Sequence, residues 1–346
     1  MYSFLIYNII LLNSIGCGYI AEFDNSKNHR LLARWLLFFT LFIPAAIRYE
    51  VGYDYGNYSE IYNGLVDSYI DEPGFLFLQN FARYLHLDTQ WIFVLTSFVM
   101  YFPICFCIKR KSFFMISSFY TLYVYIESLS FVRQFLAVTF LICALYYYLY
   151  SSSKIKAYLY GCSSLLFHLS ALFVLLTYPF KKIKLGKPIY IYGMIFAFYI
   201  LIVKFDFINL LFTVAMLLIP RYGGYMNTDW NSDVEIGSGL GVFIRLSIPF
   251  TIFFFRKKIF EQNSKNLYLI MLNLVYVVVN ILTIKVQIFG RLNSLFLFIA
   301  LFNMAVLYQL DSKFRKLIIF SLFILSIFLF ERNILNVYPY HTIFEL

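Results

Sequence analysis

The chain consists largely of apolar stretches that are long enough, or nearly long enough, to cross a lipid bilayer as a helix. A crossing helix needs about 20 apolar residues, and stretches of roughly that length recur from residue 2 to residue 331. Hydrophobic residues make up 62% of the chain and charged residues 13%, whereas a soluble domain is about one quarter charged. The alternating strands of an outer-membrane barrel are absent. We therefore expect an all-α polytopic membrane protein.

The predicted spans follow these apolar stretches. They are residues 2–20, 31–47, 90–108, 112–127, 130–150, 188–204, 239–255, 266–284, 290–310 and 316–331. Two further apolar segments, 155–180 and 205–220, contain polar residues, so each is either a span or a re-entrant segment. The sequence predicts about 10–12 transmembrane or re-entrant helices in one integral membrane domain, residues 1–346.

Basic residues indicate which ends of the spans face the cytoplasm, because short cytoplasmic loops are enriched in Lys and Arg. Two loops have this composition: they contain Lys27, Arg30 and Arg34, and Lys109–Lys111. With both loops inside, the tyrosine-rich segment 48–89, which carries an amphipathic run, and the loop 221–238 lie on the periplasmic side. The net charge of +10 then follows from topology, so no nucleic-acid partner is expected.

The segment 155–180 allows two topologies. Four lysines follow it: Lys181, Lys182, Lys184 and Lys187. A full crossing would place these lysines outside, against the charge rule. A re-entrant segment that turns near His168 would keep them inside and would place His168 in a cavity, because non-helical backbone at membrane depth must be buried in protein or face water. We favour the second topology, and the first stays open.

Four arginines are not explained by topology: Arg48, Arg133, Arg221 and Arg291. Each lies at the predicted outer end of a separate apolar segment. An arginine there can extend to lipid headgroups, but a charge near hydrocarbon often marks a functional site. The planar guanidinium matches phosphate oxygens in a bidentate manner. Gathered in one bundle, the four side chains would bind a diphosphate.

Catalytic and sugar-binding candidates lie close to these arginines in the sequence. Acid–base candidates are His168, Asp54 and Glu72, and candidate substrate contacts are Tyr53, Tyr55, Tyr58, Gln134, Tyr222 and Tyr225. Flat rings stack on sugar faces, although tyrosines are also common at membrane interfaces. Glu72 precedes Pro73 and could equally cap a helix. The sequence shows no paired acidic motif beside the arginines, so neither a metal nor another cofactor is expected.

Six short motifs occur in one order between residues 48 and 293: "RYEVGYDYGNY", "EPGF", "VRQFLA", "FHLSAL", "PRYGGY" and "FGRLN". In this order they resemble the EpsG / Wzy-like polysaccharide polymerase family. Tyr53 stands where that family usually has a small polar residue.

The resemblance implies a polymerase of O-antigen or capsular repeat units in the bacterial inner membrane, with its active site facing the periplasm. Its substrate would be an undecaprenyl-diphosphate-linked oligosaccharide in membrane lipid, and a chain-length regulator is a possible partner. The implied fold is that of the metal-independent GT-C-like lipid-sugar glycosyltransferases.

Three other functions are compatible with parts of the pattern. A lipid-linked oligosaccharide flippase or transporter would show internal repeats and charges near the bilayer midplane, whereas the key arginines lie at one end of the spans. An O-antigen ligase would use nearly the same chemistry with a different acceptor. A multi-span acyltransferase would use a catalytic histidine but would not need four outward arginines.

Overall fold

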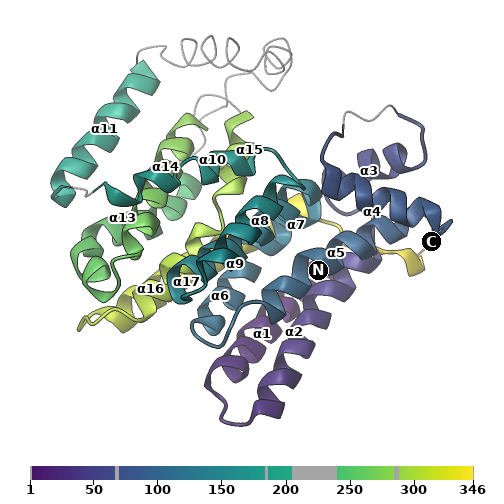
Figure 1. The fold of residues 1–346 in the computed structure, drawn as a ribbon, viewed down its shortest axis with the longest axis horizontal. Coiled ribbons are helices and arrows are strands. Elements are labelled where there is room, and N and C mark those ends of the chain that lie inside the picture. The colour runs from purple at the N-terminus through teal and green to yellow at the C-terminus, as the bar shows by residue number, and fades with distance from the viewer. Residues whose placement is uncertain (1, 67–69, 184–185, 205–239, 284–287, 346) are drawn as a thin grey trace. The chain divides into compact units, whose positions relative to one another are not determined.

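The computed structural model describes residues 2–66, 70–183, 186–204, 240–283 and 288–345. These residues form two compact units, Met1–Leu176 with Ala300–Leu346, and Thr177–Ile299 (Figure 1). The predicted loop 221–238, the apolar run 205–220, and three site candidates lie outside the described residues. These candidates are Arg221, Tyr222 and Tyr225.

The first unit is almost entirely helical. Its helices are α1 (Tyr2–Phe23), α2 (Lys27–Ile47), α3 (Tyr55–Tyr62), α4 (Pro73–Tyr84), α5 (Gln90–Phe106), α6 (Phe113–Tyr120), α7 (Ile126–Ser130), α8 (Val132–Tyr150), α9 (Lys154–Leu165), α10 (Ala171–Leu175), α16 (Ile299–Tyr308) and α17 (Arg315–Ile334). A π-helical turn, Thr121–Tyr125, joins α6 to α7, and short 3-10 turns occupy Leu335–Val337 and Ile343–Glu345. The two strands β1 (Arg48–Tyr49) and β2 (His341–Thr342) pair antiparallel.

The described residues of the second unit form a 3-10 turn, Tyr178–Lys182, and the helices α11 (Pro188–Lys204), α13 (Leu240–Gln262), α14 (Asn266–Leu282) and α15 (Ile288–Leu295). The hydroxyls of Thr177 and Tyr268 lie 3.1 Å apart and connect the start of the unit to α14. Tyr192 donates from α11 to the carbonyl of Phe250 on α13, at 3.0 Å. Arg291, one of the predicted diphosphate contacts, lies on α15 of this unit.

Among the described residues the predicted spans lie mostly in helix, although the span 290–310 is divided between α15 and α16, and this confirms the all-α polytopic membrane fold. Among the described residues, 4 helices are long and apolar enough to cross a membrane alone: α1, α2, α8 and the helical segment Arg315–Val337. The bent pair Phe289–Leu295 and Ile299–Tyr308 passes the same test together. The helices Gln90–Phe106, Pro188–Ile202 and Asn266–Leu282 are apolar but shorter.

Burial distinguishes a central helix of the first unit from peripheral ones. In α8, 78% of the apolar window is buried, against 33% in α1 and in α2 and 28% in α17. Helix α8 packs against both α5 and α9 (Figure 1). Large apolar side chains such as Leu12 and Phe320 are more than 60% exposed, as expected for helices that face lipid.

Basic residues of the first unit gather at one end of its helices. Arg34 of α2 donates to the carbonyls of Cys105 and Ile108, which links α2 to the end of α5. Arg110 donates to the carbonyl of Glu22 at 2.5 Å. The Lys111 ammonium lies 5.4 Å from the ring centroid of Tyr150, at the end of α8. This grouping fits the cytoplasmic side expected from the charge rule; the orientation itself stays a prediction.

The chain folds back on itself around His168. Helix α9 ends at Leu165 and α10 begins at Ala171. A Cβ at Gly161 would lie 3.4 Å from the Leu175 side chain, and these two positions are equally far from His168 along the chain. The predicted bend is therefore present. Its depth in the membrane and the side from which it enters stay predictions.

Candidate functional site

Arg133 and Glu72 form an ion pair at the end of the first unit opposite the lysines. Arg133 lies in the first turn of α8, directly after Phe131 breaks the helical path with φ −104° and ψ 63°. Its Nη1 lies 2.7 Å from Oε2 of Glu72, and the two side chains are 26% and 16% exposed. The pair is therefore shielded from water yet reachable from outside.

Glu72 is positioned by the two residues that follow it. Pro73 is the first residue of α4, where its fixed φ suits a helix start. The amide of Gly74 donates to the carbonyl of Leu166 at 2.7 Å. A Cβ on Gly74 would lie 2.9 Å from that carbonyl oxygen and 2.9 Å from the Phe167 ring, so this approach requires glycine. The contact brings the "EPGF" and "FHLS" motifs together.

Tyr58 joins the ion pair from α3. Its buried hydroxyl accepts hydrogen bonds from Nε of Arg133 at 3.4 Å and from the Arg133 amide at 3.5 Å. Burial raises the pKa of Tyr58; the Arg133 charge opposes this rise and the carboxylate of Asp54 adds to it. The phenol therefore stays neutral between a cation and an anion. We refer to Arg133, Glu72, Tyr58 and Asp54 as the arginine cluster.

The loop before α3 is held against the start of α8 by a close backbone contact. Gly52 has φ +98°, and a Cβ there would lie 2.2 Å from the Leu129 carbonyl oxygen. The amide of Tyr53 donates to Ser130 Oγ at 3.2 Å, and the exposed Tyr53 ring stacks on Phe131 with centroids 6.4 Å apart. This docking places Asp54 near Tyr58.

Arg48 lies in a different environment from Arg133. It is 1% exposed, its Nη1 donates to the Ala45 carbonyl at 3.1 Å, and its Cζ lies 4.9 Å from the Phe93 ring centroid. Burial lowers the pKa of Arg48, and Tyr101 and Tyr125 act in the opposite direction; the guanidinium still carries its charge at neutral pH. Direct contact with a diphosphate would require this part of the fold to open.

His168 is half-buried on the turn that follows α9. Its Nδ1 accepts a hydrogen bond from the Ser170 amide at 3.1 Å. In neutral histidine one ring nitrogen accepts and the other carries the proton, so Nε2 is the protonated nitrogen here. The Nε2 N–H of this tautomer can donate a hydrogen bond, and the role of His168 as a base stays a prediction.

The remaining sequence candidates are placed as follows. Gln134 is 5% exposed on α8, next to Arg133. Tyr55 is buried and belongs to a pocket described below. Arg291 is half-buried in the second unit, so the convergence of the arginines stays a prediction. Within the described ranges, no three His, Cys, Asp or Glu side chains form a group able to hold a metal.

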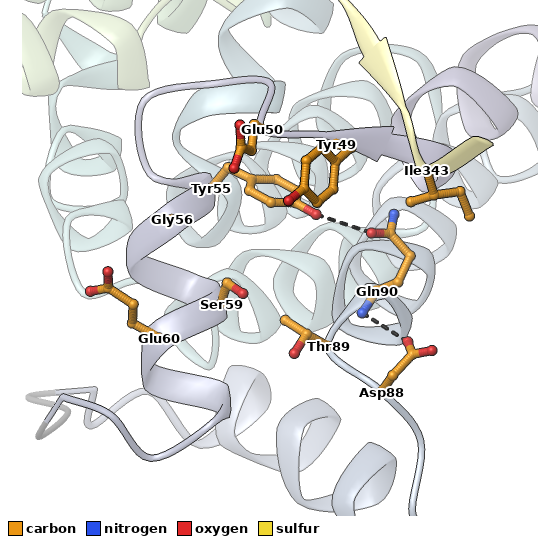
Figure 2. Close-up of a pocket in the computed structure, with 10 residues that line it drawn as sticks. All are labelled: Tyr49, Glu50, Tyr55, Gly56, Ser59, Glu60, Asp88, Thr89, Gln90 and Ile343. Atoms are coloured by element: carbon orange, nitrogen blue, oxygen red, sulfur yellow. Dashed lines mark hydrogen bonds between the residues drawn. The ribbon is translucent and has the colours of Figure 1, made fainter. Parts of the chain in front are cut away.

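A pocket of about 520 Å³ lies beside α3, on the side of Tyr55, Ser59 and Glu60. It is lined by Tyr49, Glu50, Tyr55, Gly56, Ser59, Glu60, Asp88, Thr89, Gln90 and Ile343 (Figure 2). Sequence reasoning did not select Glu50, Asp88 or Gln90. The position of Glu50 inside the "RYEVGYDYGNY" motif is a signal that could have identified it. No local feature of the sequence indicates that Ile343 lines this pocket.

Comparison with known proteins gives one match. A family model described as "EpsG family" matches residues 31–345, nearly the whole chain. No curated protein and no solved structure matches. The GT-C-like architecture implied by the resemblance therefore stays an expectation.

Proposed function

Since the chain belongs to the EpsG family, whose members are Wzy-like polymerases, we propose that it is a membrane-embedded glycosyltransferase that polymerises oligosaccharide repeat units. The repeat units are carried on undecaprenyl diphosphate in the bacterial inner membrane, and the reaction occurs at the periplasmic face. The growing glycan is transferred to the next unit, and a chain-length regulator is a candidate partner.

The observation that carries this proposal is the arginine cluster. A guanidinium is well suited to phosphate oxygens, and Arg133 lies at the helix end opposite the lysines, with its Nη1 2.7 Å from Glu72. Glu72 holds the guanidinium in place until a diphosphate arrives. In this proposal Arg133 contacts the diphosphate, and contacts from Arg221 and Arg291 stay the expectation from the sequence.

The reaction needs one displacement at carbon. The acceptor hydroxyl oxygen on the incoming unit forms a bond to the anomeric carbon of the growing glycan. The bond from that carbon to the diphosphate oxygen breaks, and its electron pair leaves with the lipid diphosphate. Negative charge therefore develops on the leaving group, where a positioned donor contributes about 2–4 kcal/mol of transition-state stabilisation.

The proposal also names the groups that transfer the proton. The hydroxyl proton passes to a carboxylate, and Asp54 is the first choice because Glu72 is paired with Arg133. His168 donates from Nε2 to the leaving diphosphate or to a sugar oxygen. Guanidinium and imidazole donors thus take the place of a metal ion in this proposal, and Tyr53 and Gln134 contact the sugars.

Gene deletion and complementation test the proposal. Cells of the natural host that lack this protein should retain glycan caps of one repeat unit but lose the ladder of longer glycans on a gel. Wild-type protein should restore the ladder, and Arg133→Lys should not. Loss of all surface glycan would instead indicate transport or ligation, and an unchanged ladder would contradict the proposal.

A further inference from the structure

We propose that the pocket beside α3 is a separate binding subsite for a non-acidic sugar of the glycan, distinct from the arginine cluster. The inference rests on the proposed function, because it names what a second site on the same face would bind. The volume of the pocket, about 520 Å³, falls in the range of small-ligand pockets, roughly 300–1,000 Å³.

The charge of the pocket determines which part of the substrate it accepts. Three carboxylates, Glu50, Glu60 and Asp88, lie on its wall, and among its described lining residues none is a lysine or an arginine. A diphosphate or a uronic acid would be repelled here. A neutral or amino-bearing sugar would instead find acceptors for its hydroxyl or ammonium protons. The pocket therefore suits the glycan rather than the diphosphate.

Two tyrosine rings form the flat part of the wall, Tyr49 and Tyr55 (Figure 2). The Tyr55 ring stacks on Phe93 with centroids 4.2 Å apart and planes inclined by 8°. Its hydroxyl donates to Oε1 of Gln90 at 3.1 Å. Tyr49 meets Tyr55 edge to face, with centroids 5.9 Å apart. One aromatic surface is thus fixed before any ligand binds, which lowers the entropic cost of binding.

The amide of Gln90 ties this wall to the backbone below it. The side-chain Nε2 of Gln90 donates to the carbonyls of Ala46 at 2.5 Å and Arg48 at 3.1 Å. The backbone amide of Gln90 donates to Oδ1 of Asp88 at 3.0 Å. Asp88 is therefore oriented at the pocket edge by the same residue that holds Tyr55 (Figure 2). Tyr55, Gln90 and Asp88 thus form one connected set of hydrogen-bonded groups in the pocket wall.

Glu50 is held at the pocket rim in an unusual backbone conformation. Its φ is +53°, a region that non-glycine residues seldom adopt. The preceding residues are fixed by strand pairing, Arg48 with Thr342 and Tyr49 with His341. Glu50 also lines a neighbouring pocket of about 330 Å³ with Tyr53 and His341. The carboxylate is thus placed between two cavities on this face.

Helix α3 connects the pocket with the arginine cluster. Tyr58 faces Arg133 from one side of α3, and Tyr55, Ser59 and Glu60 face the pocket from another. A glycan whose diphosphate end lies at Arg133 would therefore extend across α3 to reach the pocket. This arrangement assigns the two chemically different ends of one substrate to two sites.

The test measures binding of the glycan without its diphosphate. The probe is the repeat-unit oligosaccharide released by mild acid from the lipid-linked material of cells that lack this protein. Binding to the full-length protein in lipid nanodiscs is followed by calorimetry. Gly56→Leu fills the pocket from a position where a Cβ meets nothing within 4 Å, and Asn57→Leu, the next residue on α3, is the matched control.

We expect the wild type and Asn57→Leu to bind the probe with similar affinity, and Gly56→Leu to bind at least ten times more weakly. Trigalacturonate, an acidic trisaccharide, should not compete. Wild-type affinity in Gly56→Leu, absence of wild-type binding, or competition by trigalacturonate would each overturn the subsite. Polymer formation by the same preparations is measured separately, so failure of the subsite and failure of the polymerase proposal are distinguishable.

Discussion

The guanidinium of Arg133 lies 2.7 Å from the carboxylate of Glu72, although the two residues are 61 positions apart and belong to different helical segments. Neither side chain is exposed by more than 26%. A pair so shielded keeps more of its Coulomb attraction than a surface pair does. In the proposed reaction the diphosphate, which carries more charge than one carboxylate, competes with Glu72 for Arg133.

The first prediction concerns the planar guanidinium of Arg133 and its ability to donate two parallel hydrogen bonds. Replacement by Lys keeps the charge but removes bidentate donation, so polymer formation should fall by roughly 100-fold, the typical effect of losing one transition-state donor. Glycan length on gels gives the measurement. Arg332→Lys, an exposed position on α17, is the control and should leave the ladder unchanged. Equal losses in both variants would show that the effect is unspecific.

The second prediction separates stability from chemistry in the same pair. Glu72→Arg combined with Arg133→Glu restores an ion pair of opposite orientation, so the Tm of the double variant in detergent should exceed that of either single variant. Activity should not return, because the cation would no longer lie on α8. Recovery of polymer formation in the double variant would refute the assigned roles.

The third prediction compares two glycines of one motif. Gly52→Ala should lower Tm by several degrees, because its Cβ would lie 2.2 Å from the Leu129 carbonyl oxygen and its φ is +98°; overpacking of this kind costs roughly 1–3 kcal/mol or more. Gly56→Ala, where nothing lies within 4 Å, should keep or raise Tm, since alanine favours helix. A smaller effect at Gly52 than at Gly56 would argue against the docked loop.

The fourth prediction tests the buried setting of Arg48. Its Nε and Nη2 lack hydrogen-bond partners in the described part of the chain, and a buried charge can often be replaced by an apolar side chain of similar size at little cost. Arg48→Met should therefore retain its Tm and its glycan ladder. If Arg48→Met folds with an unchanged Tm but forms no polymer, Arg48 would have to be counted among the diphosphate contacts.

The fifth prediction concerns His168 as a donor. Gln retains an N–H donor but is not a base, so His168→Gln should keep more activity than His168→Ala when the two proteins are present in equal amounts. Equal loss in both variants would favour proton abstraction by the imidazole. Polymer yield per amount of membrane protein is the measurement.

The helices were predictable because an apolar run of about 20 residues is itself the signal for a crossing helix, and the predicted spans lie mostly in helix. Family membership was likewise predictable from the motifs. The sequence also selected Arg133 at the end of a span and Glu72 and Tyr58 in the segment 48–89, since their charges and ring are visible locally. It did not distinguish Arg133 from Arg48, because both lie at the predicted outer end of an apolar run, and only packing shows that Arg48 is fully buried.

Long-range pairing was beyond the sequence for a physical reason. The strand at His341–Thr342 has two residues, too few to show alternation, yet it fixes the conformation next to Glu50. The role of Gln90 in holding Tyr55 has no local signal either, because a glutamine at a helix start is unremarkable. Contacts of this kind determine the shape of the pocket, whereas the apolar runs determine only the positions of the helices in the sequence.

The most direct measurement places the purified protein in nanodiscs with the lipid-diphosphate-linked repeat unit and follows both products by mass spectrometry. We predict that the wild type lengthens the glycan and releases one lipid diphosphate for each unit joined, and that Arg133→Lys does neither at a comparable rate. Glycan lengthening at the wild-type rate by Arg133→Lys, or no lengthening by the wild type, would contradict the central claim that Arg133 stabilises the departing diphosphate.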